Sequence, residues 1–259
     1  NKNINTDPSF NTWDVEKVIN MKGMFKDAIH FNKNIYNWDT FGCLTMSEMF
    51  MGAKQFNNYI NTILTIWRVD SVLNMSSMFN GATNFNRRID NWNTYRCKNM
   101  SKMFMNASNF NQPINTWDPS NISYTDLESH FHDIINEYEN NHIDLYFTPT
   151  IENFLYEYEG KRWNVSNVTD MQYMFDNATS FNQPLYDWSV NNVTNMQFMF
   201  YNATSFNQDI SNWDVSSVDN GNFSGMFFNT PITYDLSKVT DISNAWSSNP
   251  YWDALDASL

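Results

Sequence analysis

The sequence predicts an α/β solenoid of about nine coils, each containing a short helix and a short parallel strand. Two observations lead to this fold class. Tryptophan recurs at a nearly constant interval along the 259 residues, and each interval contains an apolar stripe of helical period followed by an Asn-rich segment. Because one such unit is too small to bury its own apolar face, the copies must stack on one another.

Tryptophan marks the period of the repeat. Five intervals between equivalent positions are 25 residues long, and the others are 29, 46 and 21. The positions are Trp13, Trp38, Trp67, Trp92, Trp117, Trp163, Trp188 and Trp213, with Tyr234 in a ninth slot. A Val, Ile or Cys stands five residues after each Trp, and a Met-Phe pair and a Phe-Asn pair follow in most units. Equivalent slots are therefore expected to form columns within one continuous core.

The helix of each unit is predicted from the spacing of its apolar residues. Met196, Met199, Phe200 and Ala203 fall at positions i, i+3, i+4 and i+7, which form one stripe on about two helical turns. A helix of this length is unstable alone, so neighbouring copies have to hold it in place.

The strand is predicted from the segment that follows, Phe206 to Trp213. Pro113 and Pro184 stand in the equivalent segments of other units and exclude a helix there. We expect a short extended segment that pairs in parallel with its copies at a spacing of about 4.8 Å. The Asn after each Phe is expected to bond its side-chain amide to the backbone of its own and the next coil, which forms a ladder.

The repeat resembles that of the BspA-like leucine-rich-repeat surface proteins. The residues that carry the resemblance are Trp213-Asp214-Val215-Ser216-Ser217-Val218 and Phe181-Asn182-Gln183-Pro184-Leu185. It covers residues 10 to about 120 and 163 to about 246. The resemblance implies a leucine-rich-repeat-like solenoid. Proteins of this kind are bacterial surface lipoproteins and adhesins, similar repeats occur in large DNA viruses, and no particular ligand is implied.

The breaks in the period divide the predicted solenoid into three parts. Residues 1–120 form an N-terminal repeat array, 121–160 a degenerate coil with a helical insertion, and 161–259 a C-terminal array that ends in an atypical coil. The insertion is either a functional outgrowth or a tolerated surface loop. The last coil either closes the core or begins further repeats. Since the chain starts without Met, we expect a mature or trimmed segment.

Composition excludes several classes of function. The formal charge of -13 disfavours binding to a phosphate backbone, and no run of 18 apolar residues is present to span a membrane. No Gly-rich phosphate loop, HExxH, GxSxG or paired CxxC motif occurs. We therefore expect no enzyme, no cofactor and no metal site. A weak site at His130, His132 and His142 is the alternative, although helical residues two apart face different ways.

The two cysteines are expected to be buried free thiols. Cys43 and Cys97 occupy the Val slot two coils apart, which places their Cα atoms about 10 Å from each other. A disulfide bond requires less than about 7 Å.

The function predicted is a non-enzymatic repeat scaffold that acts as a protein-interaction or adhesion module, at a cell surface or extracellular. The alternative is a structural component of a virus particle, on the virion surface or as a capsid-associated spacer. The partner is then a host protein or a neighbouring structural protein. Outward positions near the Ile slot vary between units, as recognition requires and as neutral drift also produces. These candidate binding residues are Tyr36, Tyr59, Arg87, Arg88 and Tyr186.

Overall fold

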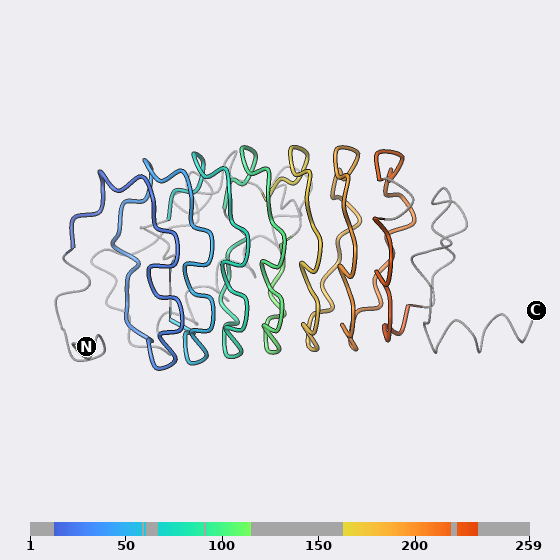
Figure 1. The fold of residues 1–259 in the computed structure, drawn as a ribbon, viewed down its shortest axis with the longest axis horizontal. Coiled ribbons are helices and arrows are strands. Elements are labelled where there is room, and N and C mark those ends of the chain that lie inside the picture. The colour runs from blue at the N-terminus through green and yellow to red at the C-terminus, as the bar shows by residue number, and fades with distance from the viewer. Residues whose placement is uncertain are drawn as a thin grey trace, which may run out of the picture.

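Consecutive repeats lie side by side in chain order (Figure 1). The computed structural model describes residues 13–58, 60, 67–90, 92–114, 163–218 and 222–232. Seven repeats fall within these ranges, and each begins at a tryptophan. They begin at Trp13, Trp38, Trp67, Trp92, Trp163, Trp188 and Trp213.

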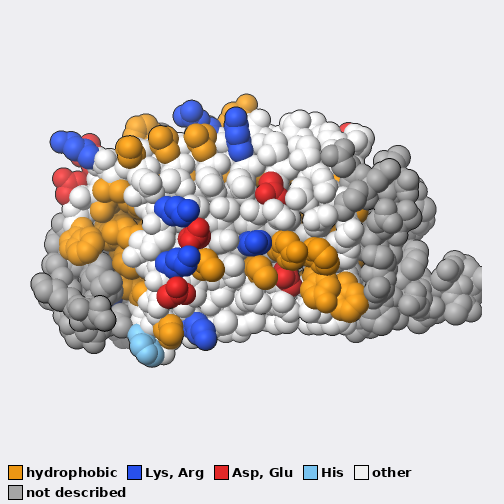
Figure 2. Space-filling model, in the orientation of Figure 1, with side chains coloured by type: hydrophobic (Ala, Val, Ile, Leu, Met, Phe, Trp, Pro, Cys, Tyr) orange, Lys and Arg blue, Asp and Glu red, His pale blue; other side chains and the backbone are white. Residues whose placement is uncertain are grey.

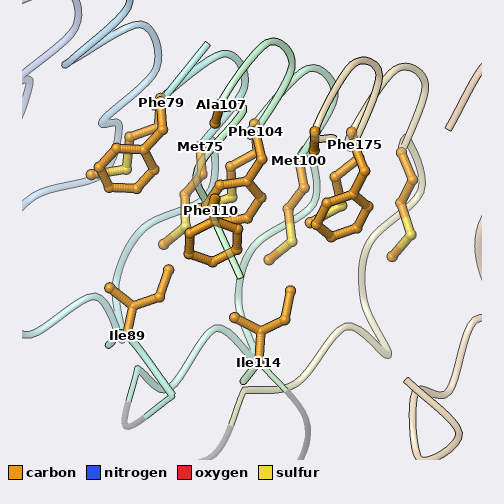
Figure 3. Packing of buried hydrophobic residues seen from close by; sticks show 14 of the residues in the cluster. Met75, Phe79, Ile89, Met100, Phe104, Ala107, Phe110, Ile114 and Phe175 are labelled. Carbon is orange, nitrogen blue, oxygen red and sulfur yellow. The ribbon is translucent and has the colours of Figure 1, made fainter. Parts of the chain in front are cut away.

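Aromatic columns run through the stack. Rings of four neighbouring Trp pairs, Trp13–Trp38, Trp38–Trp67, Trp92–Trp163 and Trp188–Trp213, lie 6.1 to 6.3 Å apart with nearly parallel planes. The Phe of the Met-Phe pair stacks on its copies at 5.4 to 5.9 Å. Figure 3 shows this column at Phe79, Phe104 and Phe175, with Met75 and Met100 beside the rings. The columns bury the apolar face of every described repeat.

The repeat that ends near Ile114 is a direct neighbour of the repeat that begins at Trp163. Trp92 stacks on Trp163 at 6.3 Å, and Phe104 stacks on Phe175 at 5.6 Å. These spacings equal those between repeats that are adjacent in sequence, so the residues between them are added without separating the two repeats. The predicted degenerate coil and helical insertion, 121–160, lie outside the described residues.

The predicted short helix is absent from the described residues, which contain turns in its place. In the second described repeat, Met49 N–H donates to Met46 O within the repeat at 3.2 Å. The next N–H group, on Phe50, donates to Met78 O of the following repeat at 2.9 Å. This alternation recurs in the first six described repeats. A helix would use every N–H group internally and leave none for the neighbour.

Two left-handed residues in each repeat impose the turns. In the second repeat they are Glu48, with φ of 59°, and Gly52, with φ of 70°. The second slot holds residues that tolerate this conformation at low cost. Its occupants are Asp27, Gly52, Gly81, Asn106, Asn177, Asn202 and Asn229. The apolar stripe still faces inward, since Met46, Met49, Phe50 and Ala53 are fully buried. The apolar spacing therefore predicted the buried face correctly, but the helix predicted from it is wrong.

The predicted strand after the Phe-Asn pair is also absent from the described residues. The Asn ladder expected there is confirmed: Asn57 N–H donates to Asn32 Oδ1 at 2.9 Å, and each later Asn repeats the bond at 2.9 Å. Because a side-chain oxygen takes the place of a backbone carbonyl, no main-chain strand pairing forms at this position. Parallel pairing occurs elsewhere, as isolated bridges between single residues. The bridged residues are Asn20, Thr45, Asn74, Asn99, Asp170 and Asn195.

The predicted α/β solenoid, leucine-rich-repeat-like with a helix and a strand in each coil, is therefore wrong. Within the described part of the chain, the repeats are built from turns, bridges and side-chain ladders. The physical reason is that successive N–H groups of the turn segment bond alternately within the repeat and to the next repeat, so neither a run of internal helix bonds nor a continuous strand ladder is required.

Two thiols and the carboxyl groups of Asp90 and Asp176 are buried in the described part of the stack. Cys43 and Cys97 are free and buried, as predicted. Burial raises the pKa of both thiols, that of Cys97 to about 12. Asp176 is only 5% exposed, and its Oδ1 accepts a hydrogen bond from Asn177 Nδ2 at 2.7 Å. Burial raises the pKa of this carboxyl group from 3.8 to about 6.

Truncation of a column Phe is expected to destabilise the protein strongly. Phe79→Ala and Phe200→Ala should each lower the free energy of unfolding by about 3–5 kcal/mol, because each leaves a cavity between stacked rings. Urea titration measures the change, with Tyr95→Ala as an exposed aromatic control. A loss under about 1 kcal/mol at either Phe would contradict the stacked core.

The buried thiols are expected to be protected in the native state. A maleimide reagent should label Cys43 and Cys97 slowly in the folded protein and rapidly after unfolding, because the thiolate is the reactive species and burial suppresses it. Labelling is followed by mass spectrometry without reductant. Rapid labelling of the native chain, or none after unfolding, would be incompatible with two buried free thiols.

The substitution Asp176→Asn is expected to stabilise the protein at neutral pH. The folded-state pKa of Asp176 is raised, so the folded chain favours the protonated carboxyl group. The stability that this protonated group contributes is fully present below about pH 4 and is lost as pH rises through 6. The variant should gain about 1–3 kcal/mol at pH 7 and nothing at pH 4, measured by urea titration at both values.

Asp214→Asn supplies the control of opposite sign. Hydrogen bonds from the Ser216 hydroxyl and backbone N–H lower the pKa of Asp214, so its ionised form is favoured in the folded chain. A gain at pH 7 for Asp214→Asn equal to that for Asp176→Asn would indicate a general charge effect instead.

Candidate functional site

The binding residues predicted from sequence do not form one cluster. Tyr36 and Tyr186 occupy the same slot in the first and fifth described repeats, so three repeats separate them. Tyr186 is 56% exposed, whereas Tyr36 is half-buried. Tyr59 lies outside the described residues. Arg87 and Arg88 belong to the third repeat and to two other slots.

Arg87 holds neighbouring repeats together. Its Nε donates to the Asn57 carbonyl of the preceding repeat at 2.7 Å. In the same slot, the amides of Asn58, Gln183 and Gln208 donate to the carbonyl of the equivalent Asn one repeat earlier. Arg87 therefore replaces a structural amide.

Arg88 is also engaged within the chain. Its guanidinium group bonds both carboxylate oxygens of Asp90, with Nη2 to Oδ2 at 2.9 Å and Nε to Oδ1 at 3.3 Å. Asp90 is only 3% exposed, so removal of Arg88 would leave a buried charge without its ion pair. The arginine pair therefore stabilises the repeat.

A different surface also varies from repeat to repeat, and we call it the turn face. It consists of two slots in the turn segment whose occupants are exposed or half-buried, except Asp176 and Gly225, which are buried. The first is the left-handed slot at Gly23, Glu48, Ser77, Lys102, Tyr173, Phe198 and Gly225. The second follows the buried column Phe, at Lys26, Met51, Asn80, Met105, Asp176, Tyr201 and Phe228. Neighbouring residues in each slot are one repeat apart, so the face is continuous along the stack.

The N-terminal part of the turn face is charged. Glu48 pairs with Lys26 at 2.6 Å and with Lys22 at 3.4 Å. The hydrogen bond from Lys26 lowers the pKa of Glu48 and, in return, Glu48 raises that of Lys26. These exposed pairs are screened by solvent and contribute little to stability.

The C-terminal part of the turn face is aromatic. Tyr173 stacks on Phe198 at 5.0 Å, Phe198 meets Tyr201 edge to face at 5.6 Å, and Tyr201 stacks on Phe228 at 4.6 Å. All four rings are half-buried, so each leaves part of its surface to solvent. Figure 2 shows hydrophobic side chains gathered toward the C-terminal end of the described stack, with a Lys or Arg side chain at the edge of the group. We call these four residues the aromatic patch.

Two residues of the aromatic patch occupy strained backbone. Tyr173 and Phe198 have φ of 56° and 54°, where the left-handed conformation costs a residue with a side chain about 1–2 kcal/mol. Gly23 and Gly225 occupy the same slot without that cost. A Cβ atom on Gly225 would lie 2.6 Å from the Phe198 ring, so this glycine makes room for the ring. The backbone does not require an aromatic residue at either position.

Sequence reasoning missed the aromatic patch because only the buried slots of the turn segment were considered. Tyr173 and Phe198 stand between the two Met positions of the core pattern, and Tyr201 directly follows the column Phe. A helix would place all three on its solvent-exposed face. Large aromatic residues at these outward positions in consecutive repeats were the available signal.

A second exposed surface is an aliphatic row in the first three described repeats. Ile19, Leu44 and Leu73 are all exposed, and each backbone carbonyl accepts from the equivalent N–H of the next repeat at 2.9 to 3.0 Å. Arg68 lies over the exposed Phe41 ring at 3.8 Å beside this row.

The described residues contain no group of three or more His, Cys, Asp or Glu side chains arranged to hold a metal ion. Within the same residues, no helix is long and apolar enough to cross a membrane. The histidines considered for a weak metal site, His130, His132 and His142, lie outside the described part of the chain.

Comparison with known proteins gives a family and no described function. The family model for "Mycoplasma protein of unknown function, DUF285" matches three overlapping segments, residues 1–65, 60–153 and 125–251. A search of curated proteins and a search of solved structures each returned no match. Together the matched segments cover nearly the whole chain and overlap as a repeat array would. The chain belongs to the DUF285 family of Mycoplasma proteins of unknown function.

Proposed function

We propose that this protein is a non-enzymatic interaction scaffold, a surface-exposed module that binds a protein partner or mediates adhesion. The core of the stack is nearly uniform, since Met, Phe and Trp recur in their columns. The outward slots differ from repeat to repeat, and the stack holds them at a regular spacing on one surface. Such an array suits recognition of an irregular partner surface.

The observation that carries the proposal is the strained, outward left-handed slot. Its occupants change from Gly to Glu, Ser, Lys, Tyr and Phe although glycine has the lowest conformational cost. Conformational strain that the fold does not require is frequent at functional positions. Side chains with exposed surface at that slot therefore favour a role in contact with another molecule.

The resemblance of the repeat to BspA-like surface proteins supports a location at the cell surface or outside the cell. Several exposed apolar side chains also support a role in binding, among them Leu44, Phe41 and Tyr186. Tyr is also among the residues that contribute most to binding energy at protein interfaces.

Beads coated with the full chain are expected to bind intact cells that carry the partner, in a saturable manner. Soluble folded chain should compete, and heat-unfolded chain should not, because only the stack places the outward slots on one surface. Bound beads are counted by flow cytometry as a function of competitor concentration.

The location of the native protein distinguishes the proposed interaction module from the alternative, a structural component of a virus particle. Membrane-impermeant biotinylation should label the native protein on intact cells. Recovery of the protein only in purified virus particles, together with no competed bead binding, would instead indicate a particle component. Tyr186→Ser and Ser211→Ala, which share a slot, provide a matched pair of surface variants for the bead assay.

A further inference from the structure

Charge divides the chain into two unlike sections. Residues 13–114 contain eleven Lys and Arg against seven Asp and Glu. Residues 163–232 contain no Lys or Arg and six Asp. The repeats of both sections share the same core columns, so this difference lies in residues that the fold leaves free to vary.

The aromatic patch lies entirely in the acidic section. Equivalent slots in the basic section hold Ser77 and Asn80, or Lys102 and Met105. At the N-terminal edge of the patch, Lys102 Nζ lies 5.4 Å from the centre of the Tyr173 ring. This contact shows how a lysine from outside the chain meets the patch: its ammonium approaches a ring while its alkyl stem packs against apolar surface.

Aspartates stand in the same repeats as the patch. Asp176 fills the turn-face slot between Met105 and Tyr201, one repeat from each, and is 5% exposed. The carboxylate of Asp170 accepts hydrogen bonds from the backbone and side-chain amides of Gln172. The half-exposed rings offer apolar contact, and the six Asp of residues 163–232 give the surrounding section a net negative charge.

We propose that the aromatic patch, Tyr173, Phe198, Tyr201 and Phe228, docks a cationic segment of a partner protein, rich in Lys or Arg. The proposal rests on the proposed interaction function and adds the face and the chemistry of the partner. The long stems of Lys and Arg pack against the rings, while their charged ends lie over ring faces, as the Lys102 ammonium does at Tyr173, and are attracted by the net negative charge of the section.

Net charge decides between the possible occupants. A second copy of the chain carries its own formal charge of -13 and is repelled at long range, even though its section 13–114 is basic. Nucleic acid and anionic membranes are repelled for the same reason. A basic protein segment is attracted by the whole chain and by the acidic section in particular.

The test uses the full chain and a fluorescent eight-residue peptide of alternating Lys and Gly, with a Glu-Gly peptide as the comparison. The patch variant is Tyr173→Ser, Phe198→Gly and Tyr201→Asn, which places in each slot a residue that the chain uses in the same slot at Ser77, Gly225 or Asn80. The fold therefore accepts every change. The control variant is Ser77→Gly with Asn80→Ser in the basic section.

The wild-type chain is expected to bind the Lys-Gly peptide and not the Glu-Gly peptide, with fluorescence anisotropy as the readout. The patch variant should bind at least tenfold more weakly, and the control variant within twofold of wild type. All three chains have the same net charge. Equal binding by wild type and patch variant would therefore mean non-specific attraction and would overturn the proposal.

Two further outcomes also overturn it. A wild-type dimer in sedimentation velocity that the patch variant abolishes would identify a second copy as the occupant. In the bead assay, a patch variant that binds cells as well as the wild type does, with the same competition by soluble chain, would mean that the partner contacts another surface. The proposed interaction function would still stand. Failure of bead binding for the wild type, in contrast, counts against the interaction function itself.

Discussion

Every second N–H group of the turn segment donates to a carbonyl of the next repeat, and the rest of the architecture depends on this bond. It fixes the separation of neighbouring repeats along the stack. With that separation set, rings in equivalent slots meet at 5.4 to 6.3 Å and Asn side chains reach the backbone one repeat away. The constraint is local, so an insertion between Ile114 and Trp163 leaves the contact between Trp92 and Trp163 unchanged.

The same bond explains which residues are uniform and which vary. In the turn segment, N–H groups that point along the stack occur together with two left-handed residues per repeat, and one of these two slots holds only Asp, Gly or Asn in the described repeats. Inward slots have to match the column above and below them. Outward slots are limited neither to Asp, Gly or Asn nor by the packing of a column. Different residues therefore share one outward slot, such as Lys102, Tyr173 and Phe198.

Variation in the outward slots gives the surface its chemistry. Ion pairs around Glu48 occupy one part of the turn face, and stacked aromatic rings occupy the other. Arg87 and Arg88 stand out in the sequence as an exposed basic pair, yet both are bonded to the chain. A variable position is thus not always available to a partner. A side chain that is bonded within the chain, as Arg87 and Arg88 are, is engaged in the fold instead.

The sequence by itself determined the repeat, its inward residues and the Asn ladder, because periodic Trp, Phe and Asn imply stacking whatever the backbone conformation. It did not determine the backbone, since the spacing of Met46, Met49, Phe50 and Ala53 buries one side of a helix or of a turn ribbon equally well. Gly52, Gly81 and Asn106 share one left-handed slot in the structure. Only the tertiary structure decided between a helix and a turn ribbon, because half of the N–H groups of the turn segment bond to a different repeat. The aromatic patch was decided in the same way, by outward slots that become neighbours only when repeats stack.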